Sequence, residues 1–387
     1  MMSRALSSYL RKRAIRGPWT LTLPPLIHPP TFLVAIPSLA ESQTLPRILN
    51  SLTRQPHHLL NKLLVGVVVN NSAVASDDIR QNNLQTLDFL SQISTPFPLA
   101  IVDACSPGLE LPERQAGVGL ARRIIMDLLL ENSNDQGVFC CLDADTEVNP
   151  DYLMSIQEHF QNRDHQAAVL GFRHRPSDLP ELEDAIRVYE DWLVRTAEGL
   201  QSAGSPYAYP AVGSTMVCRT LAYAAVGGMP RNKAAEDFYF LQELAKFHRV
   251  DWLRRELVYP DPRAEQRVHL GTGMRMQQVF NGFDLQSLFF PERGFKLLKL
   301  WLDLGTSKYG VVVDELLREA EILNPSLPGF LEKENIRTSW PGIQKSSPSP
   351  NHFVRQFHRW FDGLKTMRLL KRVQDGQLDS LGNRIPS

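Results

Sequence analysis

Four short apolar runs, separated by segments with helical periodicity, most constrain what this chain can fold into. The runs suit buried strands at 31–36, 63–69, 99–102 and 137–142, and the segments between them suit helices at 44–54, 77–92 and 119–131. Strands that alternate with helices of this length form right-handed βαβ units with neighbouring strands parallel. The sequence therefore predicts an α/β fold of the Rossmann type, with a mostly parallel central sheet flanked by helices.

The pattern becomes less regular after residue 142, although a strand at 167–172 and helices at 181–200 and 235–247 are still indicated. The first 30 residues end in several prolines, which suits an irregular lead-in. Beyond about residue 275 the patterns are mostly helical, and 346–350 reads as a linker before an amphipathic helix at 353–373. We therefore expect an irregular N-terminal extension (1–30), one α/β domain (31–275) and a mostly helical C-terminal extension (276–387).

Charge and cysteine usage exclude some classes of protein. Lys plus Arg equals Asp plus Glu, so the formal net charge is zero, and a nucleic-acid binder would normally carry a basic surplus. The four cysteines form no Cys-x-x-Cys pair, and no apolar run approaches the ~18–20 residues that span a bilayer. We expect a cytoplasmic protein that binds no nucleic acid. The basic helix at 353–373 leaves a weak contact with an anionic membrane surface open, and the oligomeric state is not indicated.

Two carboxylates stand one residue apart where the fourth predicted strand ends. Asp143 and Asp145 follow the apolar run 137–142, which places them at the carboxyl edge of the sheet, where open α/β folds bind ligands. Paired carboxylates without a basic neighbour suit a hard divalent cation, and such a cation commonly accompanies a phosphate-bearing ligand. The alternative is that these acids cap the helix expected to begin near Asn149.

Five segments together resemble the family 2 type of nucleotide-sugar glycosyltransferases, which have the GT-A fold. They are the stretches 34–41 (VAIPSLAE), 67–72 (VVVNNS), 116–123 (AGVGLARR), 142–145 (LDAD) and 235–237 (AED). Two departures stand out: Ala40 replaces the usual Asn of the first motif, and Asn70 and Asn71 replace the usual Asp pair of the second. The resemblance covers roughly residues 31–275 and implies a GT-A-like fold that binds a nucleotide-sugar.

The acidic motifs receive roles from this resemblance. Asp145 is expected to bind the metal, Mn²⁺ or Mg²⁺, and Asp143 to face the ribose or metal-bound water. Asp237 is expected to be the catalytic base that takes the proton of the acceptor hydroxyl, with Glu236 as the alternate base. A single base acting by in-line displacement would invert the anomeric centre. The alternative for Glu236 and Asp237 is that they stabilise a helix N-terminus.

The first two strand ends are where the family binds the nucleoside. Pro37, Glu41, Asn70 and Asn71 lie at these positions. An Asn amide can both donate and accept hydrogen bonds, so it can pair with the edge of a base. The alternative is that the two Asn residues form a turn.

Two further residues are expected near the diphosphate and the metal. Arg122, at the start of the third helix, is expected to bind the diphosphate, and the alternative is a solvated helix arginine. His269 is a candidate metal ligand, because relatives often complete the metal shell with a late histidine and neutral imidazole ligates Mn²⁺. The alternative for His269 is a structural role.

The expected function is that of a metal-dependent inverting glycosyltransferase (EC 2.4, hexosyltransferase-like), which moves a sugar from a UDP- or GDP-sugar to a hydroxyl acceptor. Two rivals stay open. A nucleotidyltransferase on a similar sheet would need a Gly-rich basic loop after the first strand, which residues 37–41 do not provide. A catalytically inactive nucleotide-sugar-binding module would fit the departures at Ala40, Asn70 and Asn71.

Overall fold

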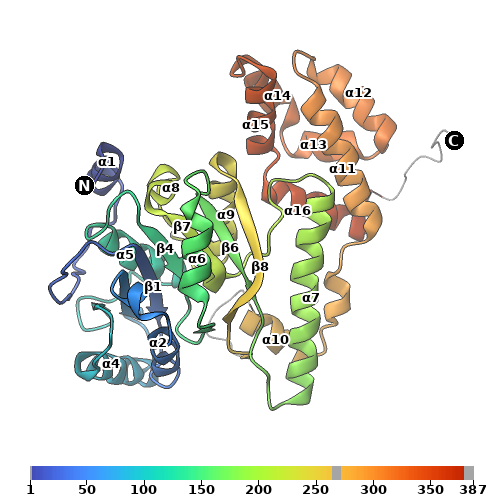
Figure 1. Cartoon of the computed structure of the whole chain (residues 1–387). Coiled ribbons are helices and arrows are strands. Elements are labelled where there is room, and N and C mark those ends of the chain that lie inside the picture. The colour runs from blue at the N-terminus through green and yellow to red at the C-terminus, as the bar shows by residue number, and fades with distance from the viewer. Residues whose placement is uncertain (1, 264–271, 379–387) are drawn as a thin grey trace. The chain divides into compact units, whose positions relative to one another are not determined.

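The computed structural model describes residues 2–263 and 272–378, and it divides into two compact units. Unit 1 comprises Met1–Arg187 and Ala211–Phe283, and unit 2 comprises Val188–Pro210 and Asp284–Ser387. The long helix α7 (Pro180–Ser202) begins in unit 1 and ends in unit 2 (Figure 1).

Unit 1 is built on an eight-stranded mixed sheet with the strand order β3-β2-β1-β4-β7-β6-β8-β5. The pairs β1–β2, β1–β4, β2–β3 and β6–β8 are parallel, whereas β4–β7, β6–β7 and β5–β8 are antiparallel. The strands are β1 (Phe32–Ser38), β2 (Leu63–Asn70), β3 (Leu99–Ala104), β4 (Val138–Cys141), β5 (Glu147–Val148), β6 (Ala167–Phe172), β7 (Met216–Arg219) and β8 (Val250–Tyr259).

Six of these strands run in the same direction, which confirms the prediction of a mostly parallel α/β sheet; β5 and β7 are the exceptions. The chain leaves unit 1 after residue 187 and returns at residue 211 before β7 begins. The connection from β6 to β7 is therefore not a single crossover helix, and β7 enters the sheet antiparallel to both of its neighbours.

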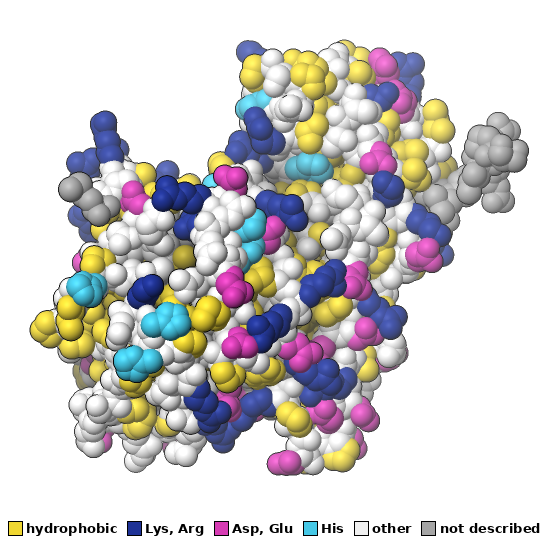
Figure 2. Space-filling view, in the orientation of Figure 1, with side chains coloured by type: hydrophobic (Ala, Val, Ile, Leu, Met, Phe, Trp, Pro, Cys, Tyr) yellow, Lys and Arg dark blue, Asp and Glu magenta, His cyan; other side chains and the backbone are white. Residues whose placement is uncertain are grey.

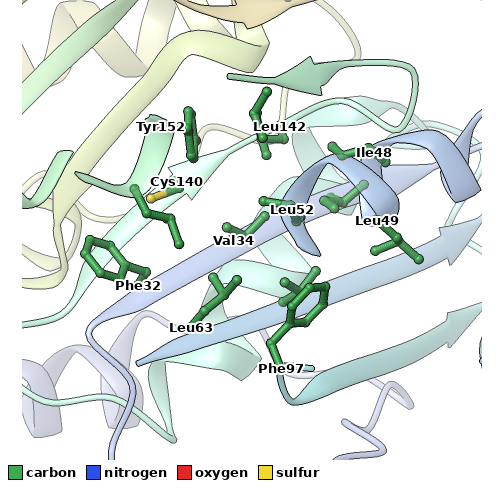
Figure 3. Packing of buried hydrophobic residues seen from close by; sticks show 14 of the residues in the cluster. Phe32, Val34, Ile48, Leu49, Leu52, Leu63, Phe97, Cys140, Leu142 and Tyr152 are labelled. Atoms are coloured by element: carbon green, nitrogen blue, oxygen red, sulfur yellow. The ribbon is translucent and has the colours of Figure 1, made fainter. Parts of the chain in front are cut away.

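Both faces of the central strands are covered, because every residue of β2 is buried. On one face, the leucines and Ile48 of α2 pack with alternate residues of β1 and β2, and Tyr152 of α6 joins them (Figure 3). On the other face lies α5, whose Ile125 and Leu129 pack so closely on Gly66 that a Cβ there would lie 2.7 Å from Ile125. The unit 1 helices are α1 (Arg4–Lys12), α2 (Leu45–Thr53), α3 (His57–Leu60), α4 (Asp77–Gln92), α5 (Val118–Leu130), α6 (Tyr152–Gln161), α8 (Thr220–Ala225), α9 (Glu236–Phe247) and α10 (Thr272–Phe280).

The N-terminal segment holds a helix where the sequence indicated an irregular extension. Ser3 caps α1 by accepting a hydrogen bond from the Leu6 amide. Leu6 and Tyr9 are buried, and the Tyr9 hydroxyl donates to Asp127 of α5 at 2.7 Å. The basic residues of its last turn, Arg11 and Lys12, are exposed.

Unit 2 is helical and has its own aromatic core. Trp301, Trp340, Phe353, Phe357 and Phe361 are almost completely buried. They pack mainly in edge-on and tilted contacts, with ring centroids 5.4–6.4 Å apart. The helices of unit 2 besides the end of α7 are α11 (Glu292–Ser307), α12 (Val313–Leu323), α13 (Leu327–Lys333), α14 (Ile336–Lys345), α15 (Pro350–Trp360) and α16 (Gly363–Gln374).

The single helix expected at 353–373 is two helices. Asp362 accepts a hydrogen bond from the Lys365 amide at 3.2 Å, and this N-cap begins α16 directly after α15 has ended. Ser349 caps α15 in the same way, with Pro350 in its first turn. Phe361, between the two helices, is buried in the aromatic core.

No helix in the described part of the chain is long and apolar enough to cross a membrane. Acidic and basic side chains are interspersed over the face seen in Figure 2, as the balanced composition implies.

The stability of unit 2 is expected to fall in mild acid because of His358. Burial lowers the pKa of His358 to about 4, whereas an unfolded histidine has a pKa of ~6.5. Below pH ~6.5 this histidine binds a proton in the unfolded chain but stays neutral in the folded unit. The free energy of unfolding therefore decreases as the pH falls. Lowering the pH from 7.5 to 5 should therefore reduce the free energy of unfolding by about 2 kcal/mol.

Denaturant unfolding of the full-length protein at both pH values tests this expectation. His358→Gln should lose this part of the pH dependence, whereas His352→Gln, which replaces the other histidine of the described part of unit 2, should keep it. An unchanged pH dependence in His358→Gln would show that other groups control acid stability.

Candidate functional site

The strand directions bring the candidate residues to one edge of the sheet in unit 1. β1, β2, β4, β6 and β8 run the same way, so their carboxyl ends share an edge. Pro37 lies at the end of β1, Asn70 ends β2, Asp143 and Asp145 follow β4, and Arg263 follows β8. The sheet topology therefore assembles a polar site from distant parts of the chain.

Arg122 connects two of the acidic motifs through ion pairs. It lies in the second turn of α5 with a fully buried side chain, and it donates to Glu236 at 2.5 Å and to Asp143. Two glycines allow α5 to approach the chain before Glu236: a Cβ on Gly119 would lie 2.3 Å from the Asn232 carbonyl oxygen, and one on Gly117 would lie 2.6 Å from Lys233. Arg122 is therefore not a solvated helix arginine.

Asp143 combines a charged contact with partial exposure. One oxygen accepts from Arg122, and the side chain keeps 38% of its surface exposed. Burial raises the pKa of Asp143 to about 6, although Arg122 acts to lower it. The carboxylates of Asp145, Asp237 and Glu41 raise it further, so these acids lie close enough to repel one another. Neither Asp143 nor Asp145 caps α6, whose N-cap is Asp151.

Glu236 and Asp237 begin α9 after a residue in a rare conformation. Ala235 has φ = 58°, in the left-handed region that is unfavourable for residues with a Cβ. Burial raises the pKa of Glu236 to about 8 against the effect of Arg122, and Asp237 adds to the increase. Burial also raises the pKa of Asp237, whose Oδ1 accepts from the Phe238 amide at 2.7 Å. Of these two acids, Glu236 therefore forms an ion pair with Arg122, and Asp237 does not.

Arg263 is a site residue that the sequence analysis missed. Its guanidinium donates to Asp145 from Nε at 3.0 Å and from Nη2, and to Glu41 at 2.9 and 3.1 Å. Glu41 is further held by the Thr44 hydroxyl. The signal for Arg263 was its position after a strand at the same edge, but β8 carries too many charged residues to have been recognised as a strand.

The predicted nucleoside residues form a buried amide network. Asn71 is held by Asn83 of α4, whose Nδ2 donates to Asn71 Oδ1 at 2.8 Å and to the Asn70 carbonyl at 3.0 Å. Asn83 Oδ1 also accepts from the Ala40 amide at 2.9 Å, and Ala40 has φ = 54°. Among the described residues, no group hydrogen-bonds to the buried Oδ1 of Asn70. The ends of β1 and β2 are thus fixed to each other through α4, with one unsatisfied acceptor.

The donor set suits a hard divalent cation. Five carboxylates (Glu41, Asp143, Asp145, Glu236 and Asp237) face two guanidinium groups (Arg122 and Arg263), which leaves an excess of negative charge. Carboxylate oxygens are the ligands preferred by Mg²⁺ and Mn²⁺. Asp145 is the most suitable ligand, although its Oδ2 is paired with Arg263 in this structure. His269, the other predicted ligand, lies outside the described residues.

Comparison with known proteins gives structural similarity at low sequence identity. No protein-family model matches the chain, and no curated protein matches it. Residues 1–349 of S. aureus TarS are similar over 90% of this chain and 92% of TarS 1–349, with 15% identity and a TM-score of 0.42. The same protein in complex with UDP-GlcNAc gives 13% identity, 89% and 92% coverage and a TM-score of 0.42.

A third similar structure is the mannosyltransferase PcManGT from Pyrobaculum calidifontis in complex with GDP-Man and Mn²⁺. It has 14% identity over 92% of this chain and 94% of that one, with a TM-score of 0.41. These values are too low to show a function, so the assignment below rests on the geometry of the site.

Proposed function

We propose that unit 1 is a metal-dependent glycosyltransferase that uses a UDP- or GDP-sugar and transfers the sugar, with inversion, to a hydroxyl acceptor. The observation that carries the proposal is the convergence of Asp145 and Asp237 on Asp143, which buried Arg122 holds at the carboxyl edge of the sheet. The five motifs that resemble family 2 glycosyltransferases with the GT-A fold support the same assignment.

The charged groups of the site would have different roles in the reaction. Asp145, together with His269, would hold Mn²⁺ or Mg²⁺, which when bound supplies charge neutralisation for the leaving diphosphate. To hold the metal, Asp145 would give up its ion pair with Arg263, which would stay paired with Glu41. Arg122 already forms ion pairs with two carboxylates. We therefore propose that it orients Asp143 toward the donor and does not itself bind the diphosphate.

Asp237 is the proposed general base, and Glu236 the alternate. The base must be a carboxylate that is not part of an ion pair. Glu236 is the less suitable candidate because it pairs with Arg122 at 2.5 Å. The raised pKa of Asp237 increases its proton affinity, which favours proton abstraction from an alcohol. The ends of β1 and β2, with Pro37, Asn70 and Asn71, would hold the nucleoside, where the unsatisfied Asn70 Oδ1 can accept a hydrogen bond.

A donor screen tests this function. The purified full-length protein is incubated with UDP- and GDP-sugars, beginning with UDP-GlcNAc and GDP-Man, with Mn²⁺, with Mg²⁺ or with EDTA. We expect saturable binding of one donor and slow release of UDP or GDP, both lost in EDTA. Asp145→Asn should weaken metal-dependent donor binding at least tenfold, whereas Asp151→Asn, which removes an exposed acid paired with Arg255, should not.

The rival functions give different products. A nucleotidyltransferase would release pyrophosphate from a nucleoside triphosphate and a sugar phosphate. An inactive module would bind a donor without releasing nucleoside diphosphate. Failure of every donor to bind would overturn the proposal.

A further inference from the structure

A second cluster of metal-binding side chains lies at the opposite edge of the same sheet. His159, His165 and Asp251 each offer one ligand atom, and these atoms all lie within 4.8 Å of one another. His165 comes just before β6, and Asp251 is the second residue of β8. Since β4, β6 and β8 run in the same direction, this cluster is at the amino ends of the strands, whereas Asp143 and Asp145 follow a carboxyl end.

We propose that His159, His165 and Asp251 bind a divalent transition metal, with Zn²⁺ as the preferred ion. Two imidazoles and one carboxylate are a common ligand set for Zn²⁺ with three protein ligands, where water fills the fourth position. The described residues of the candidate active site offer carboxylates instead, and these suit Mn²⁺ or Mg²⁺.

The hydrogen bonds around the histidines leave the right atoms for a metal. The Nδ1 atom of His165 lies 3.0 Å from the His159 carbonyl oxygen. Such a contact to a backbone carbonyl fixes the Nδ1–H tautomer and leaves the Nε2 lone pair for a ligand. The Nε2 atom of His165 lies 3.4 Å from the Asn162 amide nitrogen, a long contact that a metal could replace.

His159 and Asp251 are oriented toward each other. His159 Nε2 is 3.4 Å from Asp251 Oδ2, and both side chains are only 12–13% exposed. This Nε2 atom is buried and has no hydrogen-bond partner in the described part of the chain.

Two arginines near the cluster are already engaged. Arg249 pairs with the other oxygen of Asp251 at 2.7 Å and is mostly exposed, so it orients the carboxylate and leaves Oδ2 for the metal. Arg219 donates to the carbonyl oxygens of Phe160, Asn162 and His165. These bonds hold the turn between α6 and β6 in place. A metal here would tie α6, this turn and the start of β8 together, so its role is to stabilise the fold.

Zinc titration of the full-length protein after removal of bound metal tests the proposal. Affinity is measured by competition with a chromophoric chelator, and Co²⁺ is used as a spectroscopic probe of nitrogen and oxygen coordination. We expect one equivalent of Zn²⁺ to bind in wild type and in Asp145→Asn, and affinity to fall at least tenfold in both His165→Gln and Asp251→Asn. The double variant His57→Gln/His58→Gln, which removes an exposed histidine pair elsewhere, should bind as wild type does.

Thermal unfolding gives a second readout. Zn²⁺ at a hundredfold excess over its Kd should raise the Tm of wild type by about 5 °C, and this increase should be lost in His165→Gln. His165 is half-buried, so this variant is expected to fold, and circular dichroism checks that it does. Equal Zn²⁺ affinity in wild type, His165→Gln and Asp251→Asn, or no bound Zn²⁺ in wild type, would overturn the proposal.

Discussion

Asp237→Asn is expected to reduce sugar transfer by about a thousandfold while donor binding changes little. The substitution keeps the size of the side chain and removes the group that would take the acceptor proton. Asp237 Oδ1 accepts from the Phe238 amide, and the oxygen of an Asn can keep this bond, so the start of α9 should survive. Transfer is measured with the donor identified by the screen, and binding is measured by calorimetry.

The pH profile separates loss of a base from general damage. The pKa of Asp237 is raised, so the wild-type rate should fall in acid at a higher pH than an ordinary aspartate would cause. Asp237→Asn should lose this acidic limb. Glu243→Gln, on the same helix but partly exposed and paired with Lys246, is the matched control and should keep both rate and profile. Undiminished turnover by Asp237→Asn would transfer the role of base to Glu236.

Arg122→Met is expected to cost about 3–5 kcal/mol of stability. Arg122 is completely buried, and Glu236, its partner at 2.5 Å, has a side chain that is only 6% exposed. Removing the guanidinium would leave that carboxylate buried without a countercharge. Denaturant unfolding measures the loss, and Arg255→Met is the control, because its pair with Asp151 is more than half exposed and contributes at most about 1 kcal/mol.

A second substitution tests the cause of this loss. Arg122→Met combined with Glu236→Gln removes both the guanidinium and the buried carboxylate that would be left unpaired. The double variant should therefore recover part of the stability lost in the single variant. Arg122→Lys should fall between wild type and Arg122→Met, because one ammonium group cannot reproduce the two directed contacts of a guanidinium. A single variant as stable as wild type would show that the buried pair contributes nothing.

The sequence predicted those parts of the fold in which burial produces a clear pattern. β1, β2 and β4 are fully or almost fully buried apolar runs, and their shared direction followed from the helices between them. β8 was missed because its centre, from residue 253 to 256, is exposed or partly exposed and carries charged side chains. α1 was missed because two buried residues among basic ones form too weak a pattern.

The candidate site was predictable to the same extent. That Asp143 and Asp145 lie beside the ends of β1 and β2 follows from one rule, since the carboxyl ends of parallel strands meet at one edge. This rule does not place Glu236 and Asp237, which begin helix α9. Their countercharges were harder to predict. Arg122 was selected for a ligand but contacts two acids, and Arg263 lies 118 residues from Asp145 beyond an unpredicted strand. The catalytic, nucleotide-binding and metal-binding roles themselves stay predictions.

The large sequence separation within the site also limits how the chain can be divided. Arg263 and Glu41 are 222 positions apart, and Arg122 and Glu236 are 114 apart. A fragment that stops before residue 236 therefore carries Asp143 and Asp145 but neither the proposed base nor Arg263. Such a fragment should be inert by itself, and activity should return only if the missing piece is supplied and reassociates with it.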